Sequence, residues 1–568
     1  MMCSGCVTSL VDRLRPEHIV MVNDLGIPVN PQGNWFESAP DPSEPASDQS
    51  TSHTERWDTE GWHVPFLPYH SLAQEEYERY LKQLFAELEK HPPDPAMGKR
   101  KVMIFVHGGL NSARDSLERA GKLRTQMQND GYYPIFVVWD SSLFSTFIDS
   151  LFLVRQGRLA YDRYPVTEWL MNSVESVMSP ATTLEEDYSW LKKKKRYSWL
   201  PGILTSPPIL IRDAVRGVVR GIWDTLLLRF GIILADWPSI RTREPATTRV
   251  LGKIMGPDDS QYDPRCARVG MTKRSKKLQC QYDRILRGEP DDNVTADEIF
   301  PIAEGKDQRA GYEKALNTLS LLAGSPLGLL STMVIDFGGP GAWDMMLRRT
   351  ALQFHTDMDF AATNPRMPAH GAIALLLARL QSYIKERSKR EDWEITLVGH
   401  SMGTIVLNHM VRLYGDSFRA DHLPMFDKIV YLAAACSLRD YQDAVFPYLK
   451  TYTKEDINNP RVEEPKVYHL MLHESADLQE QHYWELSRGS LLLWIDELFT
   501  NPQYQLDRVA GRYSNFIEAI HLTPGEVRSR ISIKAANYGK KVKTTDPQHH
   551  GDFTAFPFWK EEFWTPVP

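Results

Sequence analysis

A serine flanked by small residues lies at the centre of "EITLVGHSMGTIVLNHM", residues 394–410. Ser401 belongs to a Gly-x-Ser-x-Gly pattern that follows an apolar run and precedes apolar residues at helical spacing. This pattern predicts a sharp turn between a strand and a helix, which strains the backbone at the serine. Gly399 and Gly403 let the strand and the helix pack closely without Cβ clashes. The first amides of the helix can stabilise an oxyanion, the Met402 N–H among them. We therefore predict that Ser401 is a nucleophile; the alternative is an ordinary tight turn.

The glycine-rich stretch "FVHGGLNS", residues 105–112, ends another apolar run. Acyl transfer needs a second backbone N–H for the oxyanion, supplied by the loop after a neighbouring strand. Glycines leave this backbone free to approach a substrate, so Gly109 is the preferred donor and Leu110 the next. In isolation the stretch also fits a turn that binds nothing.

The two motifs, "HGG" followed by "GHSMG", resemble the α/β-hydrolase family in its lipase and esterase-like branch. The resemblance covers residues 101–140 and roughly 366–568. It implies the family's fold, a mostly parallel sheet with helices on both faces, and the chain order serine, acid, histidine. Catalysis by such a triad needs no cofactor and no metal.

The histidine of this order is expected after the last strand, in "DPQHHGDFTAFPFW". A neutral imidazole within hydrogen-bonding reach of Ser401 can take its proton and return it to the leaving group. Members of the family place this histidine on a loop that leads into a short aromatic-rich helix, which favours His550, beside Gly551, over His549. A solvent-exposed histidine pair is the alternative.

The acid is expected on a loop after one of the later strands, where it would orient the imidazole. Asp477 and Glu474 follow the run "KVYHLMLH", and Asp440 follows "FDKIVYLAAACS". The family most often uses the later loop, so Asp477 is the preferred residue and the other two stay as alternatives. Each of the three also fits a solvated loop acid.

Short apolar runs that alternate with amphipathic helices must position these residues. One such helix is predicted in "HGAIALLLARLQSYIKERSKR", residues 370–390. Continuous apolar character is typical of strands buried on both faces of a parallel sheet. The sequence therefore predicts an α/β fold with strands in the runs 101–106, 131–140, 394–400, 426–437, 466–473 and 530–537.

Four regions follow from this pattern. Residues 1–100 should hold a β-hairpin around Asp24 to Gly26, a linker rich in Ser, Pro and acidic residues, and a helix with a capping box at Ser71 and Gln74. The hydrolase core should comprise residues 101–140 and 366–568. The segment 141–365 is far longer than a strand-to-helix connection, so we expect a large, mainly helical insertion that caps the site.

The insertion carries both basic and apolar features. Lys192 to Arg196 form a basic run, Arg212, Arg216 and Arg220 stand on one helical face, and residues 325–349 are interrupted by Gly and Pro. A helix with a basic stripe beside an apolar stripe is typical of peripheral contact with an anionic membrane. A cap whose apolar faces pack on the sheet explains the same pattern.

Composition limits the remaining functions. The 568 residues carry a formal net charge of −7 with a pI near 6.2, which gives no general attraction to nucleic acid. No secretory signal or apolar run of spanning length is visible, so we expect a cytoplasmic protein, or a lipid-anchored one if the true start lies upstream of Cys6. The spacing of Cys3, Cys6, Cys266 and Cys280 does not favour zinc.

These observations favour a serine hydrolase of carboxylic esters, with lipid-like or other acyl substrates. An acyltransferase would use the same triad with another acceptor in place of water. A non-catalytic scaffold of the same fold, which binds a membrane or a protein through the insertion, is the alternative from a different class.

Overall fold

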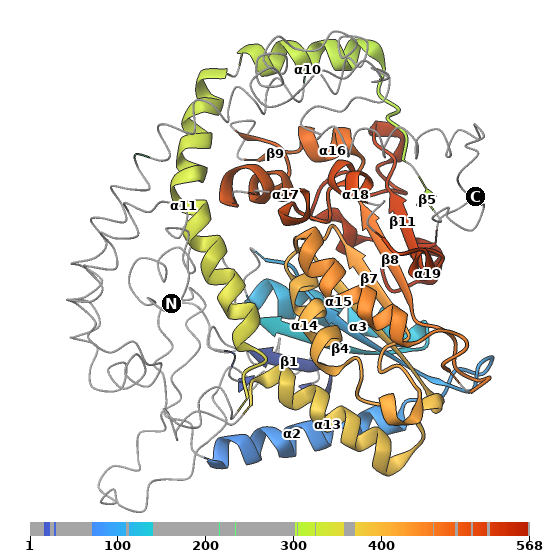
Figure 1. The fold of residues 1–568 in the computed structure, drawn as a ribbon. Coiled ribbons are helices and arrows are strands. Elements are labelled where there is room, and N and C mark those ends of the chain that lie inside the picture. The colour runs from blue at the N-terminus through green and yellow to red at the C-terminus, as the bar shows by residue number, and fades with distance from the viewer. Residues whose placement is uncertain are drawn as a thin grey trace, which may run out of the picture. The chain divides into compact units, whose positions relative to one another are not determined.

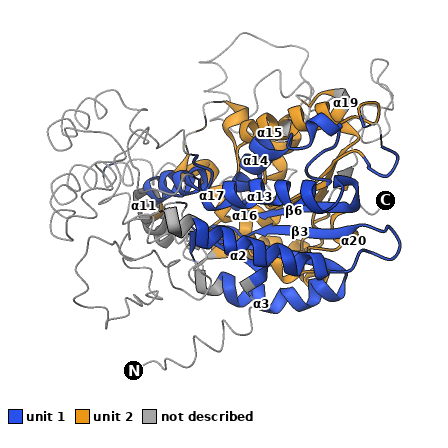
Figure 2. Cartoon of the chain, turned by 90° about the horizontal axis from the view of Figure 1, so that it is seen from below, with its two compact units in different colours: residues 1–215, 337–427, 457–463 blue, residues 216–336, 428–456, 464–568 orange. Residues whose placement is uncertain are grey.

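The structure is a computed structural model, and the chain forms two compact units (Figure 2). Unit 1 comprises residues 1–215, 337–427 and 457–463, and unit 2 comprises residues 216–336, 428–456 and 464–568. The residues that the structure describes are 16–22, 26, 28–29, 71–109, 113–139, 215, 233, 302–303, 305–323, 325–356, 370–457, 459–482, 487–500, 502, 504–519 and 523–565.

The strands of unit 1 lie in the order β2-β1-β4-β3-β6 and are parallel except for β2, which runs antiparallel to β1. The predicted N-terminal hairpin is confirmed, with Gly26 at φ 77°, and β1 also adds a parallel edge beside β4, which the sequence did not indicate. The strands are β1 Ile19–Val22, β2 Pro28–Val29, β3 Arg100–Val106, β4 Tyr132–Trp139 and β6 Trp393–His400.

The helices of unit 1 form where apolar residues recur at helical spacing. The helix predicted in residues 370–390 is confirmed as α13, and its apolar residues at helical spacing are fully buried: Ile373, Leu376, Leu377, Leu380 and Ile384. The neighbouring α2 packs beside α13 (Figure 1), where the Tyr77 hydroxyl donates to the Ala372 carbonyl at 3.0 Å. The helices are α2 Ser71–Lys90, α3 Ala113–Asn129, α13 Ala372–Arg387 and α14 Gly403–Tyr414, with short turns η1 Pro16–His18, η6 Arg390–Asp392 and η7 Arg419–Asp421.

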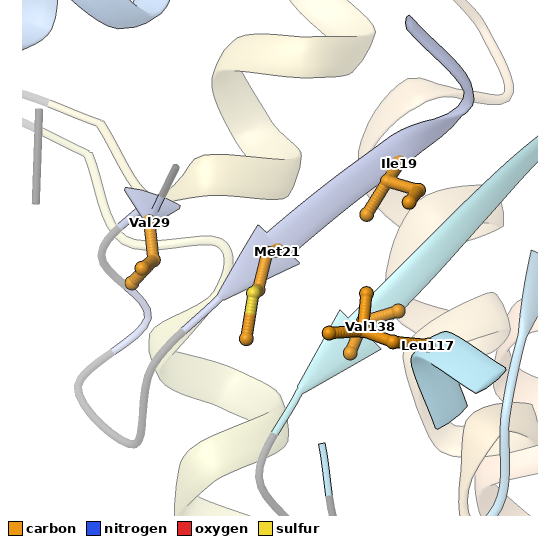
Figure 3. Packing of buried hydrophobic residues seen from close by; sticks show 5 residues of the cluster. All are labelled: Ile19, Met21, Val29, Leu117 and Val138. Carbon is orange, nitrogen blue, oxygen red and sulfur yellow. The ribbon is translucent and has the colours of Figure 1, made fainter. Parts of the chain in front are cut away.

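A small apolar cluster holds the N-terminal hairpin against this unit (Figure 3). Side chains from β1 and β2 meet a residue of α3 and one of β4, and all are at most 9% exposed. Burial of apolar side chains stabilises such a contact by roughly 1.5–3 kcal/mol per large residue. The members are Ile19, Met21, Val29, Leu117 and Val138.

Unit 2 has four parallel strands in the order β7-β8-β11-β5 and a separate antiparallel pair, β9 with β10. Its strands are β5 Ile302–Ala303, β7 Lys428–Leu432, β8 Lys466–Met471, β9 Gln481–His482, β10 Ser487–Arg488 and β11 Ile531–Ala535. Its helices are α10 Gly311–Ala323, α15 Leu438–Thr451, α16 Glu474–Gln479, α17 Leu491–Trp494, α18 Tyr513–Ala519, α19 Gly525–Arg528 and α20 Glu561–Trp564. Shorter turns are η8 Ile495–Phe499, η9 Gln505–Asp507, η11 Lys540–Val542 and η12 Asp552–Ala555.

The two units therefore confirm an α/β protein with mostly parallel strands, and the predicted strand runs all form strands. Among the described helices, none combines the length and apolar character needed to cross a bilayer.

Three described elements come from the predicted insertion 141–365: the strand β5 and the helices α10 and α11. Strand β5 pairs in parallel with β11, so part of this segment belongs to the sheet of unit 2. The helix α11 Ser325–Leu352 continues through Pro340, although Gly and Pro interrupt the apolar residues of this segment. A proline removes one backbone donor, yet surrounding structure can still maintain the helix. The basic run Lys192 to Arg196, the three spaced arginines Arg212, Arg216 and Arg220, and Cys3, Cys6, Cys266 and Cys280 lie outside the described residues.

Candidate active site

Ser401 occupies the turn between β6 and α14 in unit 1. Its φ is 51°, the left-handed region that costs a non-glycine residue about 1–3 kcal/mol. The residue is 1% exposed, and within the described part of the chain its hydroxyl oxygen has no hydrogen-bond partner. The positive φ of Ser401 confirms the strained turn that the sequence predicted between this strand and this helix.

The glycines on either side of this turn are required by close packing. A Cβ on Gly403 would lie 2.3 Å from the Val106 carbonyl oxygen at the end of β3. A Cβ on Gly399 would lie 2.9 Å from Leu407 Cδ2 and 3.0 Å from the Thr404 nitrogen. No side chain fits at either position, so the start of α14 can lie directly on the ends of β3 and β6.

The loop after β3 packs on the same turn. A Cβ on Gly108 would stand 2.8 Å from Ser401 Cβ, and one on Gly109 would stand 3.0 Å from Met402 Sδ. The structure thus brings Gly109 and Met402, the predicted oxyanion donors, close to each other within unit 1. Leu110, the alternative donor, lies outside the described residues.

His107 fixes the path of this glycine loop. Its Nε2 accepts the Trp139 backbone N–H at 3.2 Å, so the proton belongs on Nδ1, which donates to the Gly108 carbonyl at 2.7 Å. The indole N–H of Trp139 donates to the His107 carbonyl at 3.4 Å. The histidine of the "HGG" motif therefore joins the ends of β3 and β4.

In unit 2 the two candidate histidines have different surroundings. His549 is exposed, and its Nδ1 lies 3.0 Å from Asp552 Oδ2; this hydrogen bond raises the pKa of His549. His550 is 6% exposed. Gln548 holds this loop in place, because its side chain accepts the Gly539 N–H at 2.8 Å and donates to the Asn537 carbonyl at 2.8 Å.

Among the candidate acids, Asp477 is fully engaged in a different network. It is 4% exposed, accepts a short hydrogen bond from the Ser490 hydroxyl and accepts the Arg512 Nε–H at 2.9 Å. Burial raises the pKa of its carboxyl even though Arg512 opposes that shift. These contacts give Asp477 a structural role in unit 2.

The other two alternatives are at helix starts. Glu474 is the first residue of α16. Asp440 is in the first turn of α15, where its N–H donates to the Ser437 hydroxyl at 3.1 Å. Acids at these positions stabilise helix N-termini, a role that needs no catalysis.

Glu480 is the carboxylate that the structure joins to the histidine loop, and the sequence analysis missed it. Its Oε2 accepts the His550 backbone N–H at 2.9 Å. Burial raises the pKa of Glu480 to about 7, although the His550 N–H favours the charged form. Glu480 lies three residues after Asp477 in "ESADLQEQ", and nothing in that spacing distinguishes the two acids.

Among the described residues, no group of three or more His, Cys, Asp or Glu side chains is arranged so that it could hold a metal ion. His355 is buried, with its Nδ1 2.8 Å from the Leu352 carbonyl oxygen. Comparison of the chain with protein-family models, with curated proteins and with solved structures found no match.

Proposed function

We propose that this chain is a serine hydrolase of carboxylic esters, built on a core of the α/β-hydrolase type. The observation that carries the proposal is Ser401 itself, a buried serine at φ 51° between a parallel strand and a helix, with its hydroxyl unpaired among the described residues. Such strain persists where the surrounding structure imposes it, commonly at functional sites.

The reaction would proceed through an acyl-enzyme. Ser401 Oγ attacks the ester carbonyl carbon while the imidazole of His550 accepts the hydroxyl proton. The oxyanion accepts hydrogen bonds from the backbone amides of Met402 and Gly109. His550 then returns the proton to the departing alkoxide, and water repeats the sequence to release the acid and restore the serine.

We propose that Glu480 is the acid that positions His550. Asp477 was the choice from sequence, but its oxygens bind Ser490 and Arg512, whereas Glu480 accepts the backbone N–H of His550. A carboxylate held against this loop favours the imidazolium that forms during each proton transfer. Both residues belong to unit 2, so this comparison does not depend on the placement of unit 1.

The substrate class proposed is lipid-like or otherwise acyl, with the part of the insertion that precedes β5, residues 141–301, as a cap over the site. The support is the apolar character of this segment, which includes "LFSTFIDSLFLV". A hydrolase with such a cover should prefer longer acyl chains. If an alcohol acceptor yields a new ester in place of free acid, the chain is an acyltransferase.

Fluorophosphonate labelling tests the proposal directly. The folded protein should form one covalent adduct, because an activated serine attacks phosphorus while an ordinary serine does not. Mass spectrometry of the digested protein should place the adduct on Ser401, and Ser401→Ala should remove it.

Ser116→Ala is the matched control. Ser116 is another buried serine of unit 1 whose hydroxyl has no partner among the described residues, but it lies inside the regular helix α3. This variant should label at the rate of the unsubstituted protein. Absence of labelling in well-folded protein would instead favour the non-catalytic scaffold.

The pH profile of ester hydrolysis tests the role of Glu480. Because its pKa lies at about 7, the carboxyl gains its charge as the pH rises through that value, and the rate should rise with it. Glu480→Gln keeps an oxygen acceptor for the His550 N–H but removes the charge. We expect this variant to lower kcat by about 10²-fold and to lose that step in the profile.

Asp477→Asn provides the comparison, and its effect should appear mainly in thermal stability, because Arg512 loses a charged partner. If Asp477→Asn changes the pH profile and Glu480→Gln does not, the assignment of Glu480 is wrong.

A further inference from the structure

The helix α10 carries an exposed apolar stripe in unit 2. Four large apolar side chains recur at intervals of four, three and three residues, which places them on one side of a helix. Each is about 60% exposed or more: Tyr312 68%, Leu316 61%, Leu319 63% and Leu322 59%. Contiguous exposed apolar patches commonly mark interaction surfaces.

The opposite side of α10 is occupied. Leu321 is 1% exposed and clusters with Leu478 of α16 and Leu493 of α17. The Ser320 hydroxyl accepts a hydrogen bond from Arg488 at 3.2 Å. Because Leu321 anchors one side of the helix to unit 2, the exposed stripe lies on another side of α10 and is a surface of the unit.

A group of exposed lysines lies next to the start of α10. Lys306, Lys540, Lys541 and Lys543 are exposed, and backbone hydrogen bonds join the segments that carry them: Tyr538 N–H donates to the Lys306 carbonyl at 2.9 Å. The Lys540 ammonium lies 3.6 Å from the Glu313 carboxylate on α10 itself. The lysine group and the stripe therefore belong to one continuous surface.

The acids near this surface do not cancel its positive charge. Asp307 is bound by Arg309 at 2.8 Å and by Lys314 at 3.1 Å; burial alone would raise its pKa, but these partners outweigh burial and lower the pKa to about 2. The negative charge of Glu313 is offset by the ammonium of Lys540. The exposed lysines Lys306, Lys541 and Lys543 thus contribute an excess of positive charge.

We propose that this surface, Tyr312, Leu316, Leu319 and Leu322 with Lys306, Lys540, Lys541 and Lys543, binds an anionic phospholipid membrane. A helix with leucines and a tyrosine on one side would lie in the plane of the interface, with its apolar stripe among the acyl chains. The lysines would meet the negative headgroups at the N-terminal end of the helix. The proposal concerns residues apart from Ser401 and does not depend on catalysis.

Sedimentation of the full chain with phospholipid vesicles tests this proposal. We expect binding to vesicles of phosphatidylcholine mixed with phosphatidylserine, much weaker binding to pure phosphatidylcholine, and loss of binding as salt is added. Leu316→Ser with Leu319→Ser should abolish binding. Lys540→Gln, Lys541→Gln and Lys543→Gln together should weaken it by about 100-fold.

Two substitutions elsewhere serve as controls. Leu413→Ser changes an exposed leucine, 55% exposed on α14, and Lys454→Gln changes an exposed lysine of unit 2. Both should bind like the unsubstituted protein. Equal binding by the double leucine variant, or no binding to the anionic vesicles, would overturn the proposal. If that variant instead converts a dimer to a monomer in analytical ultracentrifugation without any vesicle binding, the stripe joins two copies of the chain and the membrane proposal is wrong.

Discussion

Replacing Gly403 by alanine is expected to abolish fluorophosphonate labelling of Ser401 and to lower the free energy of unfolding by about 3 kcal/mol or more. The new Cβ would lie 2.3 Å from the Val106 carbonyl oxygen and 2.8 Å from that of His107. These acceptors belong to the end of β3, which is held between β4 and β6 and cannot move aside. The helix α14 must lift instead and would carry the Met402 amide with it.

The measurement is the labelling rate together with thermal unfolding, and Gly311→Ala is the control. A Cβ on Gly311, the first residue of α10, meets nothing within 4 Å. The free energy of unfolding of Gly311→Ala should change by less than about 0.5 kcal/mol, and the labelling of Ser401 in this variant should be unchanged. Normal labelling of Gly403→Ala would show that the contact with β3 does not position the serine.

Local sequence signals were sufficient for the parts of the fold that depend on local physics. The runs that form β3, β4, β6, β7 and β8 are mostly apolar because these strands are buried, and in β11 buried apolar residues alternate with half-buried polar ones. Both patterns are readable in the sequence alone. The turn at Ser401 was also predictable, since glycines at fixed spacing are needed wherever a strand and a helix meet this closely.

Features set by distant contacts were not predictable in this way. The two residues of β5 are too few for any periodicity, and their pairing with β11 joins segments far apart in the chain. Proline normally predicts a break, so the continuation of α11 through Pro340 was missed.

The acid near His550 was missed for the same reason. The choice between Asp477 and Glu480 depends on where the loop around Gln548 returns to meet α16. In the sequence the two carboxylates are equivalent, and only their partners in the structure distinguish them: Arg512 for Asp477, and the backbone N–H of His550 for Glu480.

Replacing Arg512 by methionine is expected to lower the free energy of unfolding by about 3–5 kcal/mol near neutral pH. Arg512 is 8% exposed and donates to Asp477 at 2.9 Å and to Asp496 at 2.6 Å. Methionine fills similar space without charge, so it leaves two buried carboxylates with fewer partners. Urea-induced unfolding followed by circular dichroism would measure the loss.

The effect of pH on this loss has a definite sign. Burial would raise the pKa of Asp496, but Arg512 and Arg508 outweigh it and hold that pKa below its usual value. In the unsubstituted protein this carboxylate stabilises the fold above about pH 4, and the stabilisation is lost as the pH falls further. Without Arg512 both carboxylates become easier to protonate, and protonation removes the uncompensated charge. The deficit of Arg512→Met should therefore be smaller at about pH 5 than near neutral pH.

Arg439→Met is the matched control, because Arg439 and its partner Asp507 are 50% and 31% exposed at their side chains. Solvent screens this pair, so its removal should cost less than about 1 kcal/mol. An equal deficit of Arg512→Met at both pH values would contradict the buried-charge explanation, because lost packing contacts do not titrate. A deficit as small as that of Arg439→Met would show that Asp477 is free to act elsewhere, and the assignment of His550 to Glu480 would lose its main support.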